Sequence, residues 1–175
     1  MSLRGLYLVT PELADTDALL GAVACVLSAR PAIVQYRSKL VDPALRREQA
    51  SRLLALCRQA RIPLVINDDL ALALEIDADG AHLGRDDGDL AGARKALGQA
   101  RILGASCYGE WARAEAAVAA GVDYVAFGAM FPSSTKPQAP LAPLEMLTRA
   151  KAEFGLPVAA IGGITLDNAP LLIAA

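Results

Sequence analysis

Short apolar runs alternate with helical patterns along the whole chain, and this alternation constrains the fold more than any other feature. Because strands and helices alternate strictly, we expect a parallel sheet whose strands are joined by right-handed crossovers. The runs are apolar almost throughout, which is typical of strands that are covered on both faces. The runs predict strands over residues 5–10, 32–36, 63–66, 80–83, 101–106, 124–128 and 157–161, and the segments between them predict helices over residues 13–29, 44–60, 70–76, 90–97, 110–120, 144–154 and 167–175.

Polar residues gather where five of these strands end, at residues 35–39, 67–69, 84–87, 133–136 and 162–163. A doubly wound open sheet would concentrate its site at one switch point, whereas a closed barrel uses the loops after most of its strands. We therefore predict an α/β fold of the TIM (β/α)8 barrel type. The sequence indicates seven strands where this barrel closes with eight, so we expect the eighth strand and the last helix to be missing. Residues 1–175 are expected to form a single, C-terminally incomplete domain.

The charge balance restricts the kinds of partner. Lys plus Arg number 17 and Asp plus Glu number 19, which gives a net charge of −2. A chain without a basic excess is a poor candidate for binding nucleic acid through its overall charge. An anionic ligand must therefore be held by local charge. We expect small-molecule substrates and no nucleic-acid partner, and the sequence leaves open whether the chain forms a homo-oligomer.

The cysteines and the apolar runs bear on the compartment. Cys25, Cys57 and Cys107 lie far apart and do not indicate a disulfide framework. Cys25 and Cys57 fall in helical apolar stretches and are predicted to be small buried side chains. No secretion signal is evident, and no apolar run approaches the roughly 20 residues of a membrane span. We expect a cytoplasmic protein with no membrane partner.

Two cations follow the second predicted strand. Strand periodicity places Gln35 and Arg37 on one face, with Lys39 just beyond. Burying such cations at the mouth of a packed barrel is costly unless an anion neutralises them. Arginine offers a bidentate fork and lysine a point charge, which together suit phosphate oxygens. The alternative is a solvated loop with an unrelated salt bridge.

Two carboxylates on consecutive loops indicate a metal site. Asn67, Asp68 and Asp69 follow the third strand, and Asp87 ends the polar cluster after the fourth. We expect Asp69 to cap the next helix, because this position favours Asp. Asp68 and Asp87 remain, and magnesium typically takes one or two carboxylates together with water and substrate phosphate.

The remaining reactive residues argue against covalent catalysis. Ser106 either caps the helix that follows or contacts a ligand. The one histidine, His82, lies inside a predicted strand and is expected in the core. A Ser-His-Asp triad or a metal–histidine cluster is therefore not indicated, and Cys107 lacks an evident base.

The last two polar clusters suit a phosphate group. Ser133, Thr135 and Lys136 follow the sixth strand, and Gly163 follows the seventh. Hydroxyls, a lysine and backbone amides exposed at glycine form a plausible phosphate cradle, in loops that often bind phosphate in such barrels. The alternative for residues 133–136 is an ordinary turn region.

Taken together, six fragments resemble the thiamine-phosphate synthase family over almost the whole chain. The resemblance implies a TIM barrel that condenses hydroxymethylpyrimidine pyrophosphate with thiazole phosphate, releasing thiamine phosphate and pyrophosphate by a dissociative substitution with Mg2+ as Lewis acid. The chain departs from the family pattern at Arg85, Tyr108 and Ser133. The fragments are residues 6–10, 35–39, 66–69, 80–87, 128–136 and 160–164.

The resemblance also implies a role for each matching residue. Asp68 and Asp87 would bind magnesium, Gln35 would recognise the pyrimidine, and Ser106 would lie beside the reacting groups. The pyrophosphate would be held by Arg37, Lys39, Asn67 and Lys136. The thiazole phosphate would be contacted by Ser133, Thr135 and Gly163. The catalytic candidates are Arg37, Lys39, Ser106 and Lys136.

Two other functions stay open. A thiazole tautomerase of the same family would transfer a proton without releasing pyrophosphate, and would have little need for the cationic and magnesium residues. A non-catalytic barrel that binds a phosphate ligand, or the remnant half of a fused protein, would bind without turnover.

Overall fold

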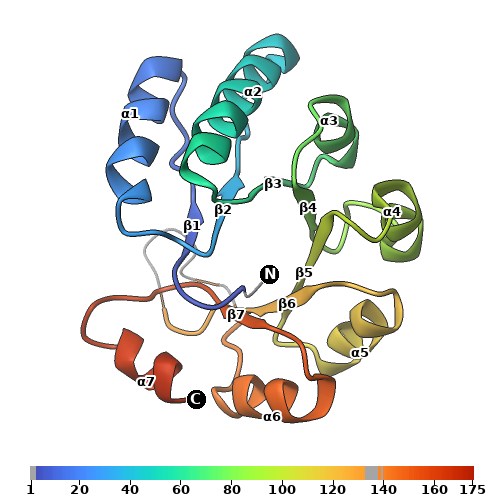
Figure 1. The fold of residues 1–175 in the computed structure, drawn as a ribbon. Coiled ribbons are helices and arrows are strands. Elements are labelled where there is room, and N and C mark those ends of the chain that lie inside the picture. The colour runs from blue at the N-terminus through green and yellow to red at the C-terminus, as the bar shows by residue number, and fades with distance from the viewer. Residues whose placement is uncertain (1–2, 133–137, 139) are drawn as a thin grey trace. The chain divides into compact units, whose positions relative to one another are not determined.

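The computed structural model describes residues 3–132, 138 and 140–175, and these contain seven strands and seven helices in strict alternation (Figure 1). The chain divides into two compact, interleaved units. The first comprises residues 1–83 and 95–102, and the second comprises residues 84–94 and 103–175.

The first unit contains four parallel strands. Their pairing aligns Tyr7 with Ile33, Val34 with Leu64, and Val65 with Gly80. The predicted parallel pairing is thus confirmed within this unit. Its strands are β1 (Tyr7–Val9), β2 (Ile33–Tyr36), β3 (Leu64–Asn67) and β4 (Gly80–Leu83), and its helices are α1 (Thr16–Leu27), α2 (Pro43–Ala60) and α3 (Leu70–Glu75).

The second unit contains three parallel strands. Gly104 pairs with Tyr124, Val125 pairs with Val158, and the register of β5 shifts between Ser106 and Tyr108. Its strands are β5 (Ile102–Tyr108), whose first residue belongs to the first unit, β6 (Tyr124–Phe127) and β7 (Val158–Ala160). Its helices are α5 (Trp111–Ala119), α6 (Glu145–Phe154) and α7 (Ala169–Ala174), while α4 (Leu90–Leu97) contributes residues to both units.

Local sequence signals set the helix starts. Asp42 accepts a hydrogen bond from the Ala44 amide, and Pro43 occupies the first turn of α2, as predicted. Asp69 accepts from the Leu72 amide and caps α3, which confirms its predicted role. The capping carboxylates replace the hydrogen bonds that the first turn of a helix cannot make internally.

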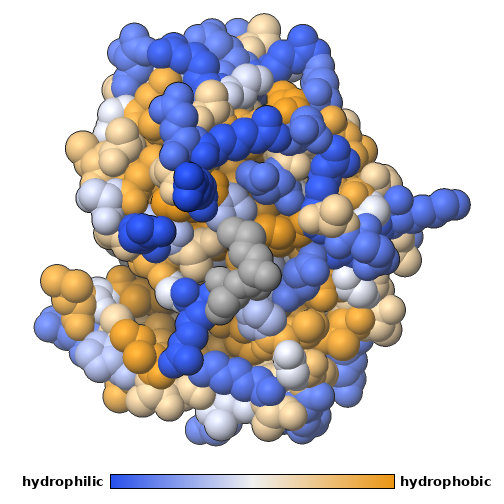
Figure 2. Space-filling model, viewed as in Figure 1, coloured by the Kyte–Doolittle hydropathy of each residue, from blue (hydrophilic) through white to orange (hydrophobic). Residues whose placement is uncertain are grey.

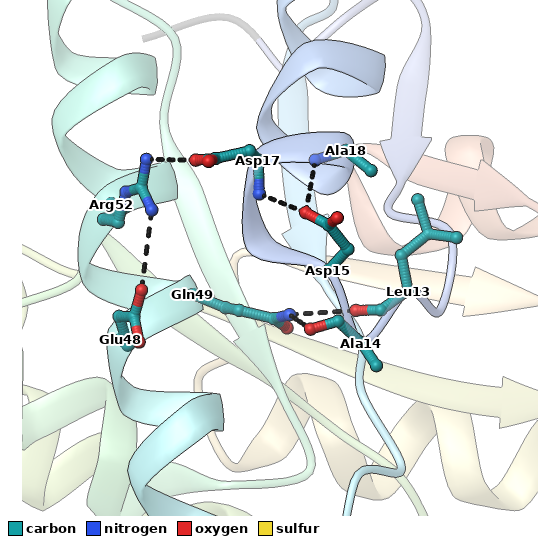
Figure 3. Close-up of polar contacts among 8 residues, drawn as sticks. All are labelled: Leu13, Ala14, Asp15, Asp17, Ala18, Glu48, Gln49 and Arg52. Atoms are coloured by element: carbon teal, nitrogen blue, oxygen red, sulfur yellow. Dashed lines mark hydrogen bonds and ion pairs between the residues drawn. The ribbon is translucent and has the colours of Figure 1, made fainter.

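A buried polar side chain joins α2 to the loop before α1 (Figure 3). The Gln49 amide nitrogen donates to the carbonyls of Leu13 and Ala14, at 2.9 and 3.3 Å. Its oxygen accepts from the Tyr36 hydroxyl at 2.8 Å. Gln49 is 1% exposed, so these partners satisfy a side chain that would otherwise be costly to bury.

The burial of Cys25 is a wrong prediction. Cys57 and Cys107 are buried, but Cys25 is exposed. Helix α1 buries Leu19, Val23 and Leu27, which recur every four residues and therefore share one face. Cys25 lies two residues after Val23, so it points away from that face.

Helix α7 is more exposed than the other helices of its unit. It has no buried residue, and Leu171 and Ile173 are among its exposed side chains, as is Leu166 just before it. The corresponding region at the lower left of Figure 2 is largely orange, the colour of hydrophobic residues. Among the described residues, no helix combines the length and the hydropathy needed to cross a bilayer.

Replacing Gln49 with leucine should lower the free energy of unfolding by about 1–3 kcal/mol, because buried partners lose their hydrogen bonds. Urea unfolding measures the change. Arg52→Ala is the control, since Arg52 makes only exposed ion pairs with Asp17 and Glu48 (Figure 3) and should leave the free energy of unfolding unchanged within error. Equal stability of the Gln49 variant and wild type would contradict the buried network.

The three thiols should react very differently. Burial raises the pKa of Cys57 to about 12 and that of Cys107 to about 11. At pH 8 both therefore remain protonated as well as inaccessible, so an aromatic disulfide reagent should modify only Cys25 in the folded protein. All three should react in denaturant. Reaction of two or three thiols in the native protein would contradict the packing.

Candidate functional site

In the first unit, a pair of hydrogen bonds fixes the end of β2 against the end of β1. The Arg37 amide donates to the Thr10 hydroxyl at 3.0 Å, and the Thr10 amide donates to the Gln35 carbonyl at 2.9 Å. Thr10 itself is buried. The backbone at Arg37 is therefore held from a neighbouring strand, although Arg37 lies just after β2.

Gln35 is buried and its amide is oriented. Its side-chain nitrogen donates to the Tyr7 hydroxyl at 2.7 Å, and Tyr7 in turn meets the His82 ring edge-on at 6.4 Å between centroids. His82 is 4% exposed, which confirms its predicted place in the core. With the nitrogen engaged, the Gln35 Oε1 atom is the side-chain group left to accept from a ligand.

Arg37 is half-buried and Lys39 is exposed. Within the part of the chain that the structure describes, neither side chain forms an ion pair. The unrelated salt bridge of the alternative interpretation is therefore not observed there. The charges of Arg37 and Lys39 are therefore not neutralised by a described carboxylate, and both side chains can bind an anionic ligand.

Asp68, in the polar cluster after β3, adopts an unusual backbone conformation. Its φ is 63°, in the left-handed region, which Asp tolerates better than most residues. Its amide donates to the His82 carbonyl at 2.9 Å, which ties it to β4. Asp68 is exposed and Asn67 half-buried at the carboxyl end of β3. The capping role of Asp69 is confirmed, whereas the metal-binding role of Asp68 stays a prediction.

The structure brings these residues to one edge of the first unit. Because β2 and β3 pair in parallel, the segments that follow them leave the sheet at the same edge. That edge carries the predicted site residues Gln35, Arg37, Lys39, Asn67 and Asp68.

In the second unit, Asp87 closes a tight turn. Its Oδ2 atom accepts from the Gly84 amide at 2.6 Å. A β-carbon at position 84 would lie 2.7 Å from that oxygen, so a larger residue there would displace the Asp87 carboxylate. Asp68 belongs to the first unit and Asp87 to the second. Their binding of one cation stays a prediction.

Ser106 lies within β5, which runs two residues further than predicted. Glu110 and not Ser106 is the N-cap residue of α5. The capping alternative for Ser106 is therefore wrong, whereas its contact with a ligand stays a prediction. The Ser106 carbonyl accepts from Arg113 Nε at 2.7 Å.

Gly163 lies in a close backbone contact after β7. Its φ is 66°, and a β-carbon there would lie 2.3 Å from the Phe131 carbonyl oxygen. The Phe131 amide also donates to the Gly162 carbonyl at 3.0 Å. Ser133, Thr135 and Lys136 lie outside the described residues.

The residues present fit a magnesium ion better than a transition metal. Asp68 and Asp87 offer hard carboxylate oxygens, which suit a cation that completes its shell with water and phosphate. Among the described residues, no group of three or more His, Cys, Asp or Glu side chains could form a protein-only metal cage.

Sequence reasoning did not assign roles to Tyr7, Thr10 and Arg113. Thr10 carries a weak signal, because a polar residue ends the apolar first strand. Tyr7 and Arg113 carry none, since their contacts join segments that are distant in sequence. All three contact a predicted site residue: Tyr7 contacts Gln35, Thr10 contacts Arg37, and Arg113 contacts Ser106.

A cleft of about 440 Å³ in the first unit lies at the opposite end of the strands and contains no predicted site residue. Its arginines are partly neutralised: Arg101, and then Arg58, hydrogen-bond to Asp77 and lower the pKa of its carboxyl. The lining residues are Arg58, Arg61, Ile62, Pro63, Asp77, Ala78, Asp79, Ala100, Arg101 and Ile102.

Structural comparison confirms the predicted fold. Thiamine phosphate pyrophosphorylase from Pyrococcus furiosus superposes with a TM-score of 0.85 at 30% identity, covering 98% of this chain and 81% of that one. A 3-hexulose-6-phosphate synthase, 20% identical with a TM-score of 0.65, shares the fold alone. The fold is of the TIM-barrel type, and the described residues contain no eighth strand.

Sequence comparison places the chain in a family. The thiamine-phosphate synthase of Azoarcus sp. (strain BH72) is 63% identical over 173 residues, which cover 99% of this chain and 84% of the relative. That of Aromatoleum aromaticum is 60% identical, with 99% and 83% covered. The sequence model of the family described as thiamine monophosphate synthase matches residues 6–175. The chain therefore belongs to the thiamine monophosphate synthase family of transferases.

Proposed function

We propose that this enzyme condenses hydroxymethylpyrimidine pyrophosphate with thiazole phosphate, and that thiamine phosphate and pyrophosphate are the products. Membership of the family over nearly the whole chain supports this reaction. The observation that carries the proposal is the pair Arg37 and Lys39, two cations after a strand end that form no ion pair within the described residues. The diphosphate of the substrate supplies their missing counter-charge.

The cation site is preorganised by its neighbours. Thr10 holds the backbone at Arg37, so the guanidinium starts from a fixed point. An arginine fork can then donate two parallel hydrogen bonds to the diphosphate, and Lys39 adds a point charge. Asn67 and Lys136 are the further proposed contacts. Such fixed donors stabilise charge that develops on a leaving group.

Gln35 suits the pyrimidine. Its nitrogen donates to Tyr7, which leaves Oε1 to accept a hydrogen bond. The exocyclic amino group of the pyrimidine is a matching donor. Because Gln35 is buried, an unmatched substrate would leave that oxygen without a partner, at a cost that favours the amino-substituted ring.

Asp68 and Asp87 are the proposed magnesium ligands. Magnesium, when bound, would neutralise diphosphate oxygens and act as a Lewis acid. The hydrogen bond from the Gly84 amide restricts the Asp87 carboxylate, and the left-handed backbone at Asp68 sets the direction in which its side chain leaves the chain. Restricted ligands lose little entropy when they bind the ion.

The reaction needs no covalent nucleophile on the protein. The bond from the exocyclic carbon to pyrophosphate breaks, pyrophosphate leaves with the electron pair, and the amino-substituted ring stabilises the cation. The thiazole nitrogen then forms the new bond to that carbon. Ser106 would lie beside these groups, and Ser133, Thr135 and the Gly163 amide would hold the thiazole phosphate. The protein contributes positioning and electrostatics.

Asp68→Asn and Asp87→Asn should each lower kcat/KM by at least about 100-fold, because a magnesium ligand loses its charge. Asparagine also tolerates the left-handed conformation at position 68, so thermal unfolding should remain that of wild type. Turnover at several magnesium concentrations measures the effect, and Asp86→Asn, an exposed carboxylate in the same cluster, is the control. Full activity of both variants would favour a tautomerase that does not need the metal.

Arg37→Ala should raise the barrier by about 2–4 kcal/mol, in the range of one preorganised charge contact. Arg37→Lys should recover only part of the loss, since it keeps the charge and loses the fork. Steady-state kinetics with varied pyrimidine substrate checks both. The control Arg47→Ala removes an exposed arginine that pairs with Glu75. Turnover of Arg37→Ala within a factor of three of wild type would exclude the assigned contact.

A further inference from the structure

Four side chains interlock beside Asp87 and Ser106 in the second unit; we call Arg85, Tyr108, Glu110 and Arg113 the Tyr108 cluster. The Arg85 guanidinium lies over the Tyr108 ring at 5.0 Å, and that of Arg113 lies 5.7 Å from the same ring centre. Arg85 also pairs with Glu110. The charge of Arg85 is thereby balanced inside the cluster, which distinguishes it from the cations Arg37 and Lys39.

Tyr108 occupies a backbone conformation that aromatic residues rarely adopt. Its φ is 55°, in the left-handed region, and it follows the register shift in β5. Irregularities of this kind redirect a side chain and are common next to active sites. The phenol is redirected toward the turn between Gly84 and Asp87, where its hydroxyl accepts from the Arg85 amide at 3.3 Å.

Two acceptors therefore hold successive amides of one turn. Asp87 Oδ2 accepts from the Gly84 amide, and the Tyr108 hydroxyl accepts from the next amide along the chain. A β-carbon at position 84 would lie 3.1 Å from that hydroxyl and 2.7 Å from the Asp87 oxygen. The glycine lets both acceptors approach, so the Tyr108 hydroxyl and the Asp87 carboxylate depend on the same short piece of backbone.

The Tyr108 cluster also contacts Ser106, the other candidate site residue of this part of the chain. Arg113, which lies against the Tyr108 ring, donates from Nε to the Ser106 carbonyl. One aromatic ring thus connects the turn that carries Asp87 with the strand residue Ser106. Tyr108 is 40% exposed, so its conformational strain is not compensated by complete burial of the ring.

We propose that Tyr108 is a positioning residue whose hydroxyl holds the turn from Gly84 to Asp87, so that the Asp87 carboxylate is preorganised to bind a divalent cation together with a diphosphate. The proposal rests on the metal-binding role proposed above for Asp87. Tyr108 acts through the turn and does not itself touch the ligand.

Tyr108→Phe tests the proposal, because it removes the hydroxyl and keeps the ring that both guanidinium groups approach. We expect the apparent affinity for magnesium, titrated calorimetrically in the presence of pyrophosphate, to fall about 3–10-fold, the range expected for one hydrogen bond. In the metal-free protein, the Arg85 amide should exchange its hydrogen faster by a similar factor. The maximal turnover at saturating magnesium should change less than twofold.

Tyr36→Phe is the matched control. It removes a tyrosine hydroxyl whose hydrogen bond to Gln49 lies in the first unit, so it should lower stability and leave magnesium affinity and Arg85 exchange unchanged. Wild-type magnesium affinity in Tyr108→Phe would overturn the proposal, whatever the exchange rate. If Asp87→Asn also binds magnesium like wild type, the metal assignment itself fails; if only Tyr108→Phe does, the positioning role alone fails.

Discussion

The parallel direction of the strands is the constraint on which the rest of the structure depends. Within each unit every strand is followed by a loop at the same edge of the sheet. Parallel pairing alone therefore brings residues that are distant in sequence to that edge. The opposite ends of the strands in the first unit carry a cleft in which Arg58 and Arg101 pair with Asp77. The candidate site residues of this unit and the Asp77 ion pairs therefore lie at opposite ends of its strands.

Charge pairing distinguishes structural cations from candidate functional ones. The Arg94 side chain is almost fully buried and bonds Asp123 at 2.5 Å, so its charge is satisfied inside the protein. Arg37 and Lys39 have no such partner in the described residues, although Arg37 is half-buried. A half-buried cation without a counter-charge loses part of its hydration, and an anionic ligand offsets that cost. This contrast supports a diphosphate at the first unit's edge better than overall net charge does.

Much of the fold could be predicted because its signals are local. The bounds of β4 and α4 match the prediction, and the caps Asp42 and Asp69 follow from residue type next to an apolar run. Cys25 was misplaced because α1 is apolar on more than its buried face, so composition could not distinguish the faces. Only the four-residue spacing of Leu19, Val23 and Leu27 does so.

The sequence proposed candidate site residues, but it could not predict their local geometry. Strand ends and polar clusters pointed to Arg37, Asp68 and Asp87 as candidates, and their roles stay predictions. The left-handed backbone at Asp68 and Tyr108 could not be predicted, because both residues contact segments that are distant in sequence. The Asp68 amide donates to the His82 carbonyl, and the Tyr108 hydroxyl accepts from the Arg85 amide. The stacking of Arg85 on Tyr108 joins residues 23 positions apart and has no sequence period.

The most direct measurement is the product balance of the purified wild-type enzyme given both half-substrates and magnesium. The account predicts thiamine phosphate and pyrophosphate in equal amounts, with neither formed when magnesium is chelated. Turnover of thiazole phosphate without pyrophosphate release, or equal product formation in the presence of the chelator, would contradict it.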